Sequence, residues 1–160
     1  MPTTNTAPVS AQAAVEEFGD LVLRAAFGLV KNPQDAEDIA QEVFLNLVRS
    51  NPVFESWEHQ KAWLLRCTIN RCKSHFRSGW YRYSAPLDET LSLPFTPQES
   101  IVLDAIRALP EKYRQVIYLH YIEGYSTAEI GQLLNRRQNT VLSQLSRGRN
   151  LLKHTLKGEF

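Results

Sequence analysis

The last segment of the chain, residues 136–157, carries six cationic side chains and no carboxylate. They are Arg136, Arg137, Arg147, Arg149, Lys153 and Lys157. The whole chain has a formal net charge of only +1, so this segment is not part of a generally basic composition. Guanidinium and ammonium groups gathered on one element bind phosphates, and each neutralised phosphate releases counterions. We therefore expect a nucleic acid to bind this end of the chain.

Charge is segregated along the rest of the chain as well. Acidic residues dominate from Glu16 to Glu58, whereas no acid occurs between Lys61 and Arg77. The cations of that second stretch are Lys61, Arg66, Arg71, Lys73 and Arg77. A second acid-free stretch predicts a second nucleic-acid contact, and the acidic front predicts a different partner. The alternative is that each charged stretch is a solvated helix face.

Enzymatic chemistry finds little support in the residue patterns. The four histidines are scattered singly, and the chain has no glycine-rich phosphate loop and no pattern of nucleophile and base. Cys67 and Cys72 are five residues apart within a helical pattern, a spacing that fits neither a zinc knuckle nor a redox Cys-x-x-C motif. The sequence predicts two half-buried thiols, no catalytic residue, no metal site and no cofactor.

The composition limits the overall organisation. The 160 residues are 43% hydrophobic and 22% charged, which is typical of a soluble globular protein with one ordinary domain or two small ones. No apolar run reaches the roughly 20 residues of a membrane span. The N-terminal stretch MPTTNTAPVSAQ lacks the basic and apolar regions of a signal peptide. We expect a cytoplasmic protein without membrane insertion.

The first half of the chain predicts a helical bundle. Residues 15–30, 33–50 and 60–76 each place apolar side chains three and four apart. Asn32 is a typical N-cap, and Pro33 suits the first helical position. The apolar stripe of the second helix consists of Ala36, Ile39, Ala40, Val43, Phe44, Leu47 and Val48. Three such helices bury their stripes against each other.

The second half predicts a helix-turn-helix domain. Thr96 with Glu99 and Ser126 with Glu129 have the spacing of capping boxes. Leu109-Pro110 separates the first of these helices from a further helix that ends at Gly124. NRR connects the helix after Ser126 to a longer basic helix. The fold class is therefore all-α, with an N-terminal bundle of three to four helices and a four-helix C-terminal domain. The expected segments are a disordered tail at 1–9, the first domain at 10–78, a linker at 79–96 and the second domain at 97–160.

Three segments resemble one family. DAEDIAQEVFLNLV, WLLRCTINRCKSHFR and LPEKYRQVIYLHYIEGYSTAEIGQLL are similar to signatures of the extracytoplasmic-function (ECF) class of bacterial RNA polymerase sigma factors. The resemblance implies an initiation factor that binds core RNA polymerase and promoter DNA. The first segment resembles the helix that docks on the clamp coiled coil of polymerase. By this likeness the core-binding residues are Asp38, Gln41, Glu42, Leu45 and Asn46.

The other two segments resemble the DNA-binding parts of these factors. The second resembles the helix that captures the single-stranded −10 element, which implies contacts from Lys61, Arg66, Asn70, Arg71, Lys73 and Arg77. Trp57, Phe76 and Trp80 are either stacking surfaces for bases or packing residues. The last helix would read the duplex −35 element in the major groove. Its expected contacts are Arg136, Arg137, Gln138, Asn139, Thr140, Ser143, Arg147 and Arg149.

The chain departs from the family pattern in its second reading helix. The family usually has a small capping residue where this chain has Arg137, and an apolar residue where it has Arg136. Leu142 stands in place of a basic residue. The start of the helix is then either frayed or capped by Asn135. Leu142 either alters −35 recognition or packs inward against Leu119 or the linker.

A different function class remains as an alternative. A helix-turn-helix regulator that does not replace the sigma subunit would need only the second domain, and the first domain argues against it. Salt-sensitive retention on DNA would exclude a module that binds only proteins. The resemblance leaves open whether an anti-sigma factor binds the chain.

Overall fold

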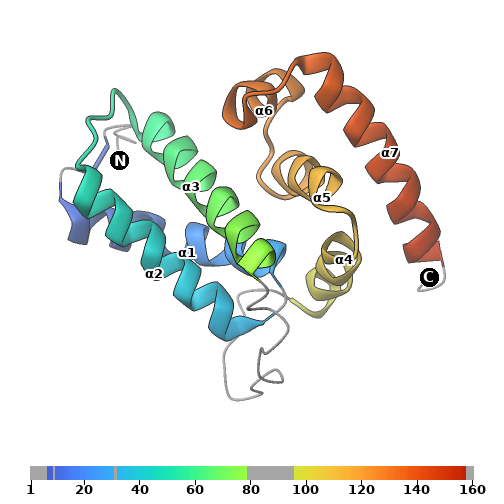
Figure 1. Cartoon of the computed structure of the whole chain (residues 1–160), viewed down its shortest axis with the longest axis horizontal. Helices are drawn as coiled ribbons and strands as arrows, with labels where there is room; N and C mark the ends of the chain where they lie inside the picture. The colour runs from blue at the N-terminus through green and yellow to red at the C-terminus, as the bar shows by residue number, and fades with distance from the viewer. Residues whose placement is uncertain (1–6, 9, 31, 79–95, 158–160) are drawn as a thin grey trace. The chain divides into compact units, whose positions relative to one another are not determined.

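The computed structural model describes residues 7–8, 10–30, 32–78 and 96–157, and this part of the chain is helical without strands. Its helices form two compact units, which confirms an all-α fold with two small domains (Figure 1). The first unit contains α1 (Ala11–Leu29, up to Phe27), α2 (Pro33–Ser50) and α3 (Trp57–Ser78). The second contains α4 (Pro97–Arg107), α5 (Glu111–Ile117), a π-helix (Tyr118–Ile122), α6 (Thr127–Leu134) and α7 (Gln138–Lys157).

The predicted segment boundaries are only partly covered by these residues. Most of the tail at 1–9 and of the linker at 79–96 lies outside the described residues. The exact limits of the two domains therefore stay predictions.

The helix starts follow from local sequence. The Asn32 side chain accepts hydrogen bonds from the backbone N–H groups of Gln34 and Asp35, at 2.8 and 3.2 Å. These bonds satisfy N–H groups that have no partner within the helix. Pro33 occupies the first turn, where its missing N–H costs nothing. The N-cap predicted for α2 is confirmed.

Both capping boxes are also confirmed. Thr96 accepts from the Glu99 N–H at 3.2 Å, and the Glu99 carboxylate accepts from the Thr96 N–H at 2.8 Å. Ser126 and Glu129 make the same pair of bonds at 3.1 and 2.9 Å. α6, the first helix of the predicted helix-turn-helix, therefore has a fixed first residue.

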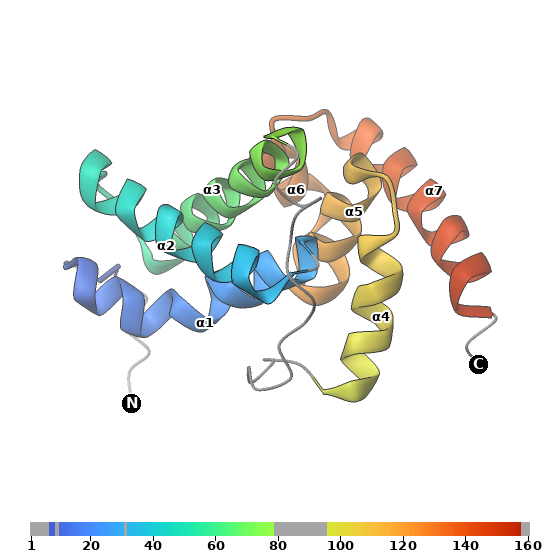
Figure 2. The ribbon, with the colours of Figure 1, turned by 60° about the horizontal axis from the view of Figure 1, so that its bottom comes forward.

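The core of the first unit forms where the three helices meet. Its fully buried side chains include Phe18 and Val22 from α1, Val43 from α2, and Leu64 and Leu65 from α3. The predicted buried stripe was too wide, because Val48 on α2 is 57% exposed. Val15, expected to be buried on α1, is 46% exposed. Figure 2 shows α1 and α2 side by side, and these exposed apolar residues lie along that pair.

Trp57 packs within the first unit. Its ring centroid lies 5.2 Å from that of Phe18, and its indole N–H donates to Glu17 at 3.0 Å. These contacts agree with the packing interpretation of Trp57. The other two aromatic candidates are Phe76 and Trp80. The side chain of Phe76 is outside the described part of the chain, and so is all of Trp80.

The second unit is built around α7. α4, α5 and α6 all contact α7, and its buried residues Val141 and Leu145 face this core. Gly148 continues the buried side of α7 by passing close to Ile117. Two large apolar side chains of this unit are exposed, Ile101 at 39% and Tyr121 at 51%. Tyr121 lies in the π-helix, whose wider turn changes the direction of its side chains relative to a regular α-helix.

Candidate nucleic-acid interface

The outward face of α7 presents side chains that can form hydrogen bonds. Asn139, Thr140, Ser143, Arg147 and Arg149 are exposed. The inward positions Val141, Leu145 and Gly148 hold the helix against the core, so the exposed residues project from a fixed backbone. α7 thus has the arrangement expected of a helix that reads DNA bases.

Two of the predicted α7 contacts are oriented by other elements. The Gln138 amide donates to the Thr127 hydroxyl at the start of α6, at 2.9 Å. The Arg149 guanidinium donates to the Tyr121 hydroxyl at 3.2 Å. Sequence reasoning missed Thr127 and Tyr121, and the exposure of Tyr121 has no signal in the sequence because it depends on the π-helix.

Arg136 has a different role from its predicted neighbours. Its guanidinium donates to Gln144 on α7 at 2.9 Å, to Gln115 on α5, and to the backbone carbonyl of Lys112 at 3.4 Å. The side chain is half-buried. Burial lowers the pKa of Arg136 below its usual value, and the nearby Glu111 offsets only part of this effect. We therefore assign Arg136 to the fold of the turn and leave it out of the DNA surface.

The turn itself is closed by Asn135. This residue has a left-handed backbone (φ 56°), and its N–H bonds to the Gln132 carbonyl at 3.4 Å. Asn135 thus ends α6 instead of capping α7. The Arg137 carbonyl accepts the first helical bond of α7, from Val141 at 3.1 Å. Arg137 itself is exposed at the entrance of the helix.

Gly131 is expected to be essential for this turn. A Cβ atom at Gly131 would lie 2.7 Å from the backbone carbonyl oxygen of Arg136, which cannot rotate away as a side chain could. Gly131→Ala should lower the free energy of unfolding by about 1–3 kcal/mol. Calorimetry of the full chain measures the change. The control is Gly19→Ala, whose nearest atom would be 3.8 Å away and which should be neutral or stabilising. Equal melting temperatures for the two variants would contradict the close approach of Gly131 to the Arg136 carbonyl oxygen.

α3 divides the predicted −10 residues between different faces. Arg66, Asn70 and Lys73 are three and four residues apart and therefore share one face of the helix. Arg66 and Asn70 are exposed and Lys73 is half-buried. Lys61 lies instead over the Trp57 ring, 5.7 Å from its centroid. Arg77 is within α3, but its side chain lies outside the described residues.

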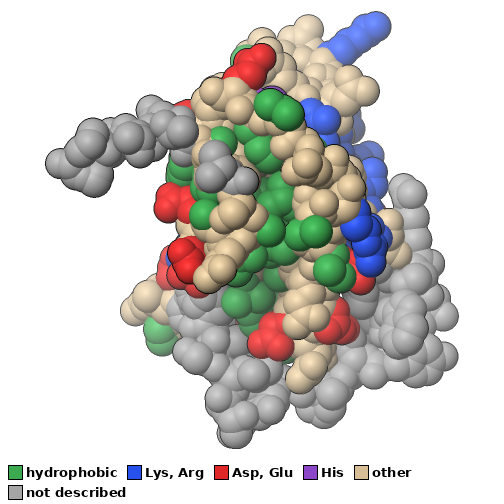
Figure 3. All heavy atoms as spheres, turned by 90° about the vertical axis from the view of Figure 1, so that its left-hand side faces the viewer, with side chains coloured by type: hydrophobic (Ala, Val, Ile, Leu, Met, Phe, Trp, Pro, Cys, Tyr) green, Lys and Arg blue, Asp and Glu red, His purple; other side chains and the backbone are tan. Residues whose placement is uncertain are grey.

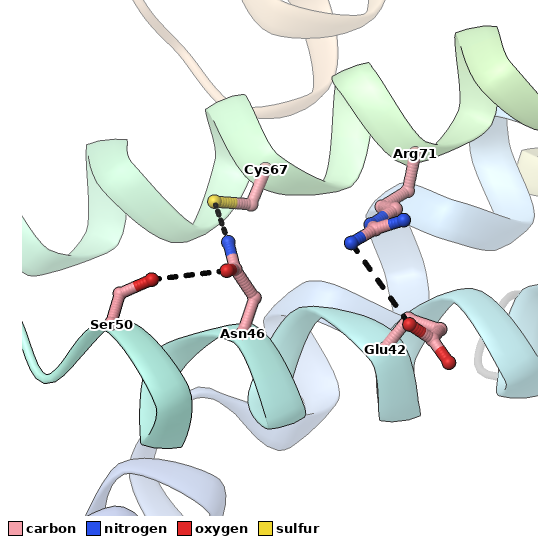
Figure 4. A network of polar contacts seen from close by, with 5 residues as sticks. All are labelled: Glu42, Asn46, Ser50, Cys67 and Arg71. Atoms are coloured by element: carbon pink, nitrogen blue, oxygen red, sulfur yellow. Dashed lines mark hydrogen bonds and ion pairs between the residues drawn. The ribbon is translucent and has the colours of Figure 1, made fainter.

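Arg71 on α3 points toward α2, where the predicted core-binding residues Glu42 and Asn46 lie (Figure 4). Its guanidinium lies 4.0 Å from the Glu42 carboxylate, and both side chains are about half exposed. Asn46 donates to the Cys67 sulfur at 3.5 Å and accepts from Ser50 at 3.1 Å. Burial raises the pKa of the Cys67 thiol, which therefore stays protonated at neutral pH. This thiol helps to join two helices.

The remaining core-binding candidates lie on the outer side of α2. Asp38 and Gln41 are exposed, and Leu45 is 44% exposed. Gln41 and Leu45 border an apolar groove between α1 and α2 with a volume of about 520 Å³. The other lining residues are Val15, Gly19, Leu23, Glu37, Ala40, Phe44 and Val48. Figure 3 shows hydrophobic side chains gathered into one stripe, with acidic side chains at its borders.

Neither a metal site nor a membrane span occurs among the described residues. No group of three His, Cys, Asp or Glu side chains there is arranged to hold a metal ion. No helix of this part of the chain is long and apolar enough to cross a membrane.

Comparison with known families and relatives agrees with this geometry. The family "Sigma-70 region 2" matches residues 14–82, and "Sigma-70, region 4" matches residues 99–152. The chain is 31% identical to the RNA polymerase sigma-E factor of Streptomyces coelicolor, over 86% of this chain and 80% of that protein. The chain belongs to the ECF RNA polymerase sigma factors. A sigma factor of this class directs RNA polymerase to promoters.

Further relatives support the same family. This sigma factor is 29% identical to the ECF RNA polymerase sigma factor SigW of Bacillus subtilis, over 89% of this chain and 87% of that protein. A solved structure of the sigma factor RpoE from Bartonella quintana, in complex with the anti-sigma factor NepR, has a similar fold. The TM-score is 0.69 at 23% identity, covering 89% of this sigma factor and 95% of that chain.

Proposed function

We propose that this sigma factor divides promoter recognition among three helices. α2 binds core RNA polymerase, α3 holds the opened −10 strand, and α7 reads the duplex −35 element. The observation that carries the proposal is the exposure of most of the described side chains assigned to these tasks, on helices whose opposite faces are buried. The exposed groups differ in charge between the helices, as binding to a protein and to nucleic acid requires.

The docking surface on α2 combines an apolar and an acidic part. Leu45 and Val48 offer apolar area beside the groove, and Asp38 and Glu42 add negative charge. Protein interfaces commonly combine an apolar centre with a charged rim that selects the partner. This combination suits the polymerase and would repel a nucleic-acid phosphate.

The −10 contact uses the face of α3 that carries Arg66, Asn70 and Lys73. Cations in line follow a sugar-phosphate backbone, and an amide between them can bond a base edge. Arg71 belongs to this group by sequence, but its guanidinium is close to Glu42. We therefore place it at the border between the strand and the polymerase surfaces.

The wider biological setting follows from the class of protein. The catalysis of transcription belongs to the polymerase, so we infer that this sigma factor is not an enzyme and needs no cofactor. It acts in the cytoplasm, where core polymerase and DNA are found. A similar fold is seen in complex with an anti-sigma factor, and we include such a partner in the proposal.

In vitro transcription tests the proposal. The purified chain is added to bacterial core RNA polymerase free of any other sigma subunit, on fragments of genomic DNA. We expect transcripts that start at defined sites and depend on the added chain. A regulator that does not replace the sigma subunit would give transcripts only when a second sigma factor is present, and that result would contradict the proposal.

Arg147 and Arg149 are expected to bind phosphates from α7. Both are exposed, and replacing both with alanine should weaken binding to all promoter duplexes alike. The slope of log K against log salt should become shallower by about 0.9 for each phosphate that is no longer neutralised. Titration with the chain assembled on core polymerase measures the slope. An unchanged slope would show that neither arginine meets a phosphate.

A further inference from the structure

Leu142 is the apolar residue of the reading face. The described side chains of α7 include two large hydrophobic ones that are exposed, Leu142 at 47% and Leu151 at 41%. Leu142 lies in the N-terminal half of the helix and Leu151 in the C-terminal half. This exposure excludes the alternative that Leu142 packs inward and leaves the alternative that it alters −35 recognition. Val141 and Leu145 take the inward positions on either side of it.

The surroundings of Leu142 are polar. Residues three and four apart are neighbours on a helix, so Leu142 lies beside Gln138, Asn139 and Ser146. All three are exposed, and the Gln138 amide is oriented by its bond to Thr127. Leu142 thus places an isobutyl group among hydrogen-bonding side chains.

This chemistry is selective in a major groove. Base pairs present hydrogen-bond donors and acceptors there, together with one apolar group, the C5-methyl of thymine. A leucine cannot form a hydrogen bond with a polar base edge and would leave it without a partner. It gains free energy when it covers a methyl group and removes it from water.

We propose that Leu142 selects a thymine in the duplex −35 element through contact with its C5-methyl group. The assignment rests on the proposed placement of α7 in the major groove, and it adds a specificity-determining residue to that function. Asn139 and Ser146 lie on either side of Leu142 and read the adjacent base edges. The contact between Leu142 and the methyl group is apolar and neutralises no phosphate, so it adds nothing to the salt dependence of DNA binding.

A substitution that removes only the methyl group provides the test. The chain assembled with core polymerase first selects duplexes from a library with ten randomised base pairs, with core polymerase alone as background. Each thymine of the selected sequence is then replaced by deoxyuridine, which differs from thymidine only in the missing methyl. We expect one position at which this replacement weakens binding by roughly fourfold, the value of one buried methyl group.

Two matched variants locate the contact. Leu142→Ala should weaken binding to the thymine duplex by a similar or larger factor and should bind the thymine and uracil duplexes equally. Leu151→Ala removes the same isobutyl group from the other half of α7 and should keep the full methyl effect. Because both leucines are exposed, both variants should melt as the wild type does.

The outcomes separate this assignment from the proposed function. If no duplex is enriched over core polymerase alone, the reading of DNA by α7 fails and the role of Leu142 fails with it. If a sequence is enriched but uracil is tolerated throughout, or Leu142→Ala retains the methyl effect, only the Leu142 assignment is overturned.

Discussion

Replacing Gln41 and Glu42 by lysine is expected to abolish binding to core RNA polymerase. Both side chains are exposed on α2, and the change reverses the charge of the surface that carries Asp38 and Leu45. Like charges brought together at an interface cost several kcal/mol, which corresponds to a loss of about 100-fold or more in affinity. Pull-down and titration of labelled polymerase with the full-length double variant measure the effect.

The folded state should survive this double substitution. The pair between Glu42 and Arg71 is 4.0 Å long and half exposed, and such pairs contribute little to stability. The matched control places two lysines at Gln12 and Glu16, exposed positions four residues apart on α1. This control has the same net charge and should bind polymerase nearly as the wild type does. Wild-type binding by the α2 variant would remove the docking assignment.

Promoter opening is expected to fail when the outward face of α3 loses its charge. Arg66→Gln combined with Lys73→Gln removes two cations that share one side of the helix. In the proposed assignment these groups bind a strand that exists only after the duplex has opened, so opening should suffer more than the initial closed complex. We expect the permanganate reactivity of thymines near −10 to fall by about tenfold or more, since removing each cation from its phosphate costs on the order of 1 kcal/mol.

A matched control removes two positive charges elsewhere in the first unit. Arg24→Gln with Arg49→Gln gives an identical net charge, with one change on α1 and one at the exposed end of α2. This variant should open promoters almost normally. If both pairs reduce the reactivity equally, the effect is one of net charge, and the outward face of α3 has no special contact with the strand.

The parts of the fold that depend on local chemistry could be read from the sequence. Asn32, Thr96 and Ser126 cap their helices as predicted, because an N-cap needs only a short side chain and the next three residues. Gly124 has φ +80° and ends a helical stretch, as a residue without a Cβ can do at low cost. The order of the helices and their grouping into two domains followed from these signals and from apolar spacing.

The features that were missed depend on contacts between distant residues. The sequence identified Arg136 as a cation near DNA, but its partners Gln115 and Gln144 lie on two other helices. A spacing rule gives the faces of a helix without saying which neighbour covers each face. For this reason Val48 was assigned to the core, although it lies at the border of the groove between α1 and α2. The division of the α3 cations between two faces could have been found from spacing alone.

The alternation of buried and exposed residues on α7 has an evolutionary consequence. Val141, Leu145 and Gly148 determine where the helix lies, while the proposed reading residues Asn139 and Leu142 have no place in the core. A duplicated gene can therefore acquire a new set of promoters by exchanging exposed residues one at a time. Such exchanges leave the buried side of α7 and the proposed polymerase surface on α2 unchanged, so a new set of promoters does not require a new core or a new docking surface.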